Sequence, residues 1–225
     1  MPHALIVAHG SPADPAPQEA RLAALAASVA ALLPDWVVRG ATLAAPGALE
    51  AALDGLETPR IYPFFMAEGW FTRTALPRRL VATRARDTAQ LAPLGVDPGL
   101  PALMAQAALE GCPGAARDRS LLIAAHGSQV SDTSADSTHA AVARLAAITP
   151  FRSVRAGFVE QAPFLAEAAR GLGPAICLPF FALRAGHVED DVPQILAEAG
   201  FDGPLLPPIG EHPGIPGLIA AALRR

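Results

Sequence analysis

The chain has 225 residues, of which 52% are hydrophobic and 17% charged, so it can bury a substantial core. The net charge of −4 and the pI near 5.8 argue against a nucleic-acid-binding protein. Two cysteines are too few for a disulfide framework or a cysteine-based zinc site. The N-terminus lacks the basic segment of a signal peptide, and no apolar stretch reaches the roughly 20 residues that span a bilayer. These features predict a soluble cytoplasmic protein without a membrane partner.

In the first half of the chain, short apolar runs alternate with segments of helical periodicity. The predicted strands span residues 4–8, 36–43, 60–65 and 91–94. The predicted helices span residues 19–33, 47–56, 73–90 and 101–110. Pro34 ends the first helix, and Pro77 is compatible with the first turn of the third.

The second half of the chain shows the same alternation. Its predicted strands span residues 120–125, 152–159, 174–181 and 204–207, and its predicted helices span residues 135–148, 163–172, 190–199 and 215–224. Strands that alternate with helices are typical of parallel sheets with right-handed crossovers.

The two halves are copies of one another. Four segments of the first half recur in the same order: ALIVAHGSP at 4–12 matches LLIAAHGSQ at 121–129, RGATLAAP at 39–46 matches AGFVEQAP at 156–163, IYPFF at 61–65 matches CLPFF at 177–181, and PLGVDPGLP at 93–101 matches PIGEHPGIP at 208–216. A period this long indicates two copies of a domain rather than a solenoid. We therefore expect two similar α/β domains, residues 1–113 and 114–225, each with about four parallel strands, facing one another across a cleft.

Three candidate metal ligands follow strands of the second copy. His126 follows the first strand, Glu160 ends the second, and His187 lies in the loop after the third. Ligands bind at the carboxyl ends of the strands in open parallel sheets, and imidazole with carboxylate suits Co, Fe, Ni or Zn. Three protein ligands also leave coordination positions open, as a catalytic site requires. Each residue alone has an ordinary structural alternative, such as a hydrogen-bonded histidine or an acid near a helix N-terminus.

The first copy keeps only the strand-end histidine, His9. In the alignment Leu43 replaces the glutamate, and Phe71, or Trp70 if a gap is introduced, replaces the second histidine. The joint loss of two ligands indicates that the three act as a set. The first copy is therefore expected to be a scaffold with a degenerate site.

The strand-end HGS, the FVE…P segment and PFFALRAGHVEDDVP at residues 179–193 resemble the class II tetrapyrrole chelatases, especially the sirohydrochlorin cobaltochelatase and ferrochelatase branch. The resemblance covers the whole chain and implies a chelatase-like pair of Rossmann-like domains. It also implies a metal chelatase, a lyase, that inserts a divalent metal (Co²⁺ or Fe²⁺, with Ni²⁺ as a further option) into sirohydrochlorin or a related tetrapyrrole in cobalamin or siroheme biosynthesis. Carried over by position, His126, His187 and Glu160 are the metal-binding and catalytic residues. No nucleotide cofactor is expected, since neither GxGxxG nor GxxxxGK[ST] occurs.

Histidine suits this reaction because a neutral imidazole binds a metal. Its unperturbed pKa of about 6.5 also allows it to accept a proton. The polycarboxylate substrate calls for arginine, which binds carboxylates bidentately. We expect Arg184 and Arg73 to bind the substrate acids, and Trp70 and Phe71 to offer a flat wall to the ring.

A non-catalytic tetrapyrrole or metal carrier is the alternative function. A histidine phosphatase is disfavoured because alanines 8 and 125 stand where an arginine would precede the histidine, and no GxSxG nucleophile motif occurs. The sequence leaves open the metal, the tetrapyrrole and the oligomeric state, and a monomer is compatible with both copies lying in one chain.

Overall fold

The computed structural model describes residues 1–83, 88–184 and 190–225. The strands are β1 (His3–Ala8), β2 (Val37–Thr42), β3 (Arg60–Pro63), β4 (Ser120–Ala125), β5 (Ser153–Phe158) and β6 (Ala175–Pro179). The α-helices are α1 (Ala16–Leu32), α2 (Ala48–Leu53), α3 (Leu76–Val81), α4 (Leu100–Glu110), α5 (Thr133–Ile148), α6 (Leu165–Ala169), α7 (Val192–Glu198) and α8 (Ile215–Arg224). Short helical turns are η1 (Phe71–Ala75), η2 (Leu94–Val96), η3 (Ala116–Asp118) and η5 (Ile209–Glu211). In the described part of the chain, no helix combines the length and apolar character that crossing a membrane requires.

The strands form two three-stranded parallel sheets, ordered β2-β1-β3 and β5-β4-β6. The expectation of a fourth strand in each sheet is wrong, because only single residues pair there: Gln90 with Ile61, and Leu205 with Cys177. Prolines 93, 207 and 208 follow these bridges closely. A proline lacks the N–H that a sheet ladder needs, so the pairing stops after one residue.

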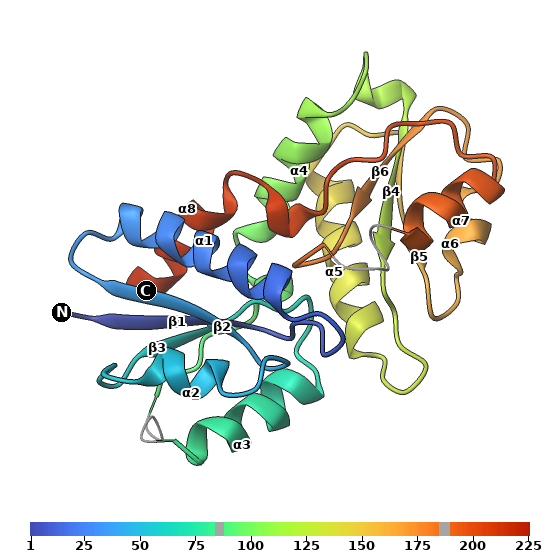
Figure 1. Cartoon of the computed structure of the whole chain (residues 1–225). Coiled ribbons are helices and arrows are strands. Elements are labelled where there is room, and N and C mark those ends of the chain that lie inside the picture. The colour runs from blue at the N-terminus through green and yellow to red at the C-terminus, as the bar shows by residue number, and fades with distance from the viewer. Residues whose placement is uncertain (84–87, 185–189) are drawn as a thin grey trace. The chain divides into compact units, whose positions relative to one another are not determined.

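The first compact unit comprises Met1–Asp97 and Pro213–Arg225. In this unit α1 and α8 cover one face of the β1–β3 sheet, and α2 and α3 cover the other (Figure 1). The buried cluster on the second face consists of residues from the three strands and from α2 and α3: Leu5, Val7, Ala41, Leu49, Leu53, Ile61, Leu76 and Leu80. Polar contacts hold the C-terminal helix to the unit, since Arg60 donates to the Leu223 carbonyl at 2.7 Å and Arg225 pairs with buried Asp97 at 3.2 Å.

The second compact unit comprises Pro98–His212. Helix α5, with α4 packed beside it, covers one face of the β4–β6 sheet, and α6 and α7 cover the other (Figure 1). The cluster beneath α6 and α7 joins Leu122 and Cys177 of the sheet to Leu165 and Leu196 of the helices. This arrangement matches the first unit, as the sequence copies predict.

The compact units and the sequence copies divide the chain differently. Helix α4 ends the first copy but belongs to the second unit, and α8 ends the second copy but belongs to the first unit. The 113/114 boundary therefore separates the copies in sequence, whereas the compact units change at 97/98 and 212/213.

The predicted helix at 73–90 is too long. The π-helical turn η1 precedes α3, which ends at Val81. Residues 88–90 are not helical, because the Ile61 N–H donates to the Ala89 carbonyl and the Leu91 N–H donates to the Ile61 carbonyl. The end of the segment predicted as helix therefore pairs with β3 instead.

Candidate functional site

His126 follows the last residue of β4, where the chain leaves the sheet. Gly127 turns the chain with φ of +76°, a conformation that favours glycine. The His126 ring is partly buried, and its Nδ1 lies 3.0 Å from the Gly127 carbonyl oxygen. His126 is therefore held at the carboxyl edge of the central strand of the sheet.

Glu160 lies beside His126 at the end of the neighbouring strand. The parallel ladder continues past β5, since the Val159 N–H donates to Ala125 at 3.0 Å and the Glu160 N–H donates to His126 at 2.9 Å. The Glu160 carboxylate accepts a hydrogen bond from the Gln129 amide, with 3.0 Å between Nε2 and Oε2. The structure thus brings two of the three predicted ligands to adjacent backbone positions.

His187, the third predicted ligand, lies outside the described residues. Within residues 1–83, 88–184 and 190–225, no group of three histidine, cysteine, aspartate or glutamate side chains could hold a metal ion. The three-ligand set therefore remains a prediction.

A second glutamine supports the turn that carries His126. The Ser128 N–H donates to Oε1 of Gln161 at 2.6 Å. The two glutamine contacts cross, because Gln129 extends from the β4 turn to Glu160 while Gln161 extends back to the turn. Neither glutamine was predicted as functional. Their positions in the sequence were the only indication: Gln129 follows the HGS segment that contains His126, and Gln161 follows Glu160 directly.

The matching edge of the first unit corrects one alignment. There the Leu43 N–H donates to Ala8 and the Ala44 N–H donates to His9, both at 2.9 Å. Counted along the ladder from the histidine, the counterpart of Glu160 is Ala44, and Leu43 instead matches Val159. The prediction that Leu43 replaces the glutamate is wrong by one residue, although the replacement remains apolar.

The two strand glycines confirm this one-residue shift. A Cβ on Gly40 would meet α1 at the Leu22 carbonyl, 2.7 Å away, whereas a Cβ on Gly157 would meet Leu165 of α6 at 2.9 Å. Gly40 and Gly157 therefore face opposite sides of their sheets, although they align in sequence. A shift of one residue in a strand exchanges its faces, which accounts for the difference.

An aromatic cluster occupies the corresponding edge of the first unit. The ring of Phe71 lies 4.2 Å from that of His9, 5.1 Å from Trp70 and 6.0 Å from Phe65, centroid to centroid. Partial burial lowers the pKa of His9, although His9 remains exposed on one side. Trp70 is 62% exposed, so its indole is accessible to a flat ligand. Phe71 thus contacts His9, the strand-end histidine of the copy that lacks counterparts of the other two predicted ligands.

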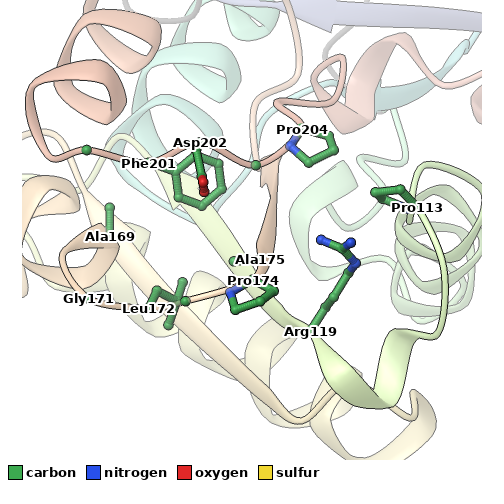
Figure 2. A pocket seen from close by; sticks show the side chains of 13 residues that line it. Pro113, Arg119, Ala169, Gly171, Leu172, Pro174, Ala175, Phe201, Asp202 and Pro204 are labelled. Atoms are coloured by element: carbon green, nitrogen blue, oxygen red, sulfur yellow. The ribbon is translucent and has the colours of Figure 1, made fainter.

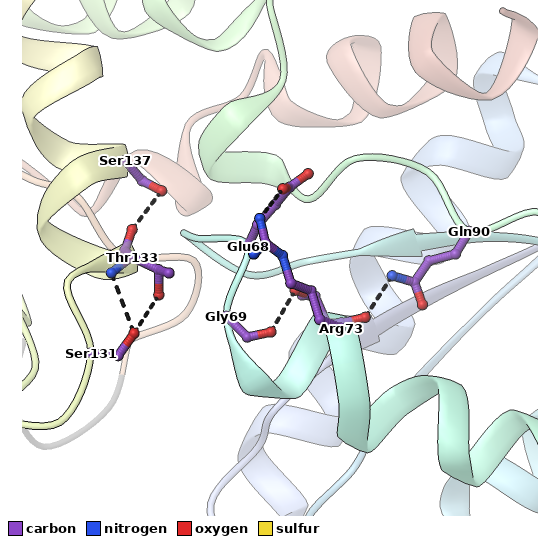
Figure 3. Close-up of polar contacts among 8 residues, drawn as sticks. Glu68, Gly69, Arg73, Gln90, Ser131, Thr133 and Ser137 are labelled. Atoms are coloured by element: carbon purple, nitrogen blue, oxygen red, sulfur yellow. Dashed lines mark hydrogen bonds and ion pairs between the residues drawn. The ribbon is translucent and has the colours of Figure 1, made fainter.

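The predicted substrate-binding arginines both have carboxylate partners. Arg184 contacts Glu211 through Nε and Nη2, with a shortest distance of 2.9 Å. Arg73 pairs with Glu68 at 2.9 Å on an exposed surface (Figure 3). A substrate carboxylate would share or displace these partners, so the substrate role of the arginines stays a prediction.

A cavity of about 610 Å³ lies at the opposite, amino end of the second sheet. It is bordered by Arg119, which precedes β4, by Ala175 at the start of β6, and by Phe201 and Asp202 (Figure 2). Neither His126 nor Glu160 lines it. The cavity is therefore separate from the His126 edge of the sheet.

The chain was compared with known proteins. The family model for CbiX matches residues 120–225. A solved structure of CbiX, described as the terminal enzyme for biosynthesis of siroheme in denitrifying bacteria, is 50% identical over 100% of this chain and 98% of its own, with a TM-score of 0.87. The chain belongs to the CbiX family. Membership confirms the resemblance to class II chelatases and the predicted enzyme class, a metal chelatase.

More distant structures share the fold. SirB from Bacillus subtilis with Fe³⁺ is 18% identical, covers 100% of this chain and 95% of its own, and has a TM-score of 0.80. SirB from Bacillus subtilis subspecies spizizenii in complex with cobalt is 16% identical, covers 100% and 94%, and has a TM-score of 0.69. A search of curated proteins found no match.

Proposed function

We propose that this CbiX-family protein inserts a divalent metal, Co²⁺ or Fe²⁺ with Ni²⁺ as a further option, into sirohydrochlorin or a related tetrapyrrole. The product would serve siroheme or cobalamin biosynthesis, and no nucleotide takes part. The observation that carries the proposal is the 50% identity over the whole chain with CbiX, an enzyme of siroheme biosynthesis. The cobalt and iron bound to SirB structures of the same fold are consistent with these metals.

The proposed metal ligands are His126, Glu160 and His187, all in the second copy (residues 114–225). His126 and Glu160 are joined through their backbones at 2.9 Å and end neighbouring strands. The argument for His187 is the internal repeat, because Phe71, its aligned counterpart, contacts His9, the counterpart of His126. Two imidazoles and one carboxylate would hold a borderline metal while leaving positions for water and for incoming ring nitrogens.

The reaction requires proton acceptors as well as metal ligands. A metal-free tetrapyrrole loses two pyrrole N–H protons as M²⁺ enters, and the net ring charge is unchanged because two protons leave for each divalent ion. One histidine accepts a proton once the metal has left it, and Glu160 or solvent accepts the second. Glu160 also offsets part of the charge of the waiting metal, so the metal is held without four strong protein ligands.

The proposed substrate contacts are the guanidinium groups of Arg184 and Arg73 and the rings of Trp70 and Phe71. Arginine can bind a carboxylate through two parallel hydrogen bonds. Arg184 already contacts the Glu211 carboxylate through Nε and Nη2. Arg73 contacts Glu68 through Nη2 alone. The exposed indole of Trp70 offers a face for stacking of a planar ring.

The test is insertion of Co²⁺ and Fe²⁺ into sirohydrochlorin, followed by visible absorption. His126→Ala and His187→Ala should each lower the insertion rate at least about 100-fold, since each removes a proposed metal ligand and one of the two candidate proton acceptors among the histidines. His139→Ala is the matched control, because His139 belongs to α5 and packs edge-on against Phe158 at 5.4 Å. Equal insertion rates in all four proteins would refute the assignment of His126 and His187 as ligands. Absence of insertion in the wild type would refute the proposed function, and stoichiometric binding without turnover would instead favour a carrier.

A further inference from the structure

We infer that Gln129 and Gln161 are positioning residues of the metal site, with Gln129 orienting the Glu160 carboxylate and Gln161 orienting the turn that carries His126. This inference rests on the proposed function. It adds two residues that contact the ligand-bearing groups and do not themselves bind the metal.

Gln129 controls which oxygen of Glu160 is available. Its amide donates to Oε2 of Glu160 at 3.0 Å. This hydrogen bond leaves Oε1 free to face a metal and limits rotation of the carboxylate. Hydrogen bonds from a second layer of residues commonly orient metal ligands, and their removal typically weakens metal affinity or activity about 10–100-fold.

Gln161 acts on the other ligand through the backbone. Its Oε1 accepts the Ser128 N–H at 2.6 Å, two residues after His126. Its side chain also fills the space beside Gly127, where an added Cβ would lie 2.8 Å from Gln161 Cγ. Contact with both residues that follow His126 fixes the direction in which the chain leaves β4, and hence the direction of the His126 ring.

The first copy supplies an internal comparison. Pro12 aligns with Gln129, and Ala45 lies at the ladder position of Gln161, so both glutamines are absent there. A different contact closes that strand end, since the Ala45 N–H donates to Oγ1 of Thr42 at 3.3 Å. The turn therefore forms without glutamines. The pair occurs only in the copy that also has the candidate carboxylate ligand, which favours a role at the metal over a role in folding.

The experiment measures Co²⁺ binding to the intact protein by visible absorption, with Gln129→Leu and Gln161→Leu against wild type. Each change should raise the Co²⁺ dissociation constant about tenfold. Gln106→Leu is the matched control, because Gln106 makes the same kind of exposed contact, with Glu110 at 2.8 Å, away from this edge. That variant should bind Co²⁺ as the wild type does.

A double variant, Gln129→Leu with Glu160→Gln, separates positioning from a general structural role. If Gln129 acts through the Glu160 carboxylate, the double variant should bind Co²⁺ as weakly as Glu160→Gln alone and no more weakly. If Gln129→Leu weakens Co²⁺ binding further in that background, or if both leucine variants bind Co²⁺ normally while His126→Ala does not, the positioning role is overturned and the proposed function stands. If the wild type itself inserts no metal, the proposed function falls.

Discussion

Gly127→Ala should lower the stability of the protein and weaken metal binding at the proposed site. An alanine held at φ of +76° costs about 1–2 kcal/mol, because its Cβ crowds the following carbonyl. The new Cβ would also lie 2.8 Å from Gln161 Cγ and 3.0 Å from Phe158 Cβ, so Gln161 must move. Loss of its hydrogen bond to Ser128 adds about 0.5–1.5 kcal/mol. The free energy of unfolding should fall by about 1.5–3.5 kcal/mol in total.

Two glycines provide matched controls for this change. Gly114 has φ of +83° and open space around it, so Gly114→Ala should cost only the backbone strain of about 1–2 kcal/mol. Gly10 makes the equivalent turn in the first copy, with φ of +81° and Thr42 Oγ1 at 2.5 Å from an added Cβ. Gly10→Ala should therefore lower stability about as much as Gly127→Ala while leaving Co²⁺ binding intact.

Denaturant unfolding followed by circular dichroism measures the free energy of unfolding of each variant, and Co²⁺ titration measures its dissociation constant for the metal. For a chain of this length, a loss of about 1.5–3.5 kcal/mol corresponds to a fall of about 3–14 °C in Tm. The reasoning fails if Gly127→Ala costs no more than Gly114→Ala. It also fails if Gly10→Ala and Gly127→Ala weaken Co²⁺ binding equally, because the site would then not depend on the second-copy turn.

The corrected ladder register predicts that a second metal site can be built in the first copy. In a Phe71→His background, Ala44→Glu should raise bound Co²⁺ from about one to about two ions per chain. Leu43→Glu in the same background should leave the amount of bound Co²⁺ unchanged. Equal metal content in these two variants, measured by elemental analysis, would contradict the corrected alignment of Ala44 with Glu160. The cysteines should also differ, because burial raises the pKa of the Cys177 thiol to about 12. At pH 8 a disulfide reagent should therefore label partly exposed Cys112 in the native protein and Cys177 only after unfolding. The contribution of the buried neutral Cys177 thiol to the free energy of unfolding should be lost as the pH rises from about 9 toward about 12. Rapid labelling of both thiols in the native protein would count against this burial.

Much of the fold was predictable because the strands are short apolar runs that end in polar or glycine residues. The predicted strand 120–125 coincides with β4, and the predicted position of His126 at its carboxyl end is confirmed. The adjacency of Glu160 also follows from parallel strand order. These features depend on local sequence, so they can be predicted from it.

Register and helix assignment were harder, because they depend on packing. The aligned glycines 40 and 157 suggest one register, but contact with different helices puts them on opposite faces. Similarly, the repeat shows where a copy ends but not which sheet its last helix covers. The contacts of Gln129 and Gln161 could not be predicted from the sequence, because the partners of an uncharged amide depend on the folded geometry.

Because each compact unit contains the last helix of the other sequence copy, α8 in the first unit and α4 in the second, the folding of each unit depends on both copies. On separate chains, each unit would need the last helix of a partner, and folding would depend on protein concentration by mass action. Joining the copies replaces that encounter with a local one, whose effective concentration is set by the connecting segment. The first copy is therefore needed by the second unit whether or not it binds a metal itself, since it supplies α4 to the unit that holds His126. Removal of α4 should therefore disrupt the second unit, although the residues of α4 belong to the first copy.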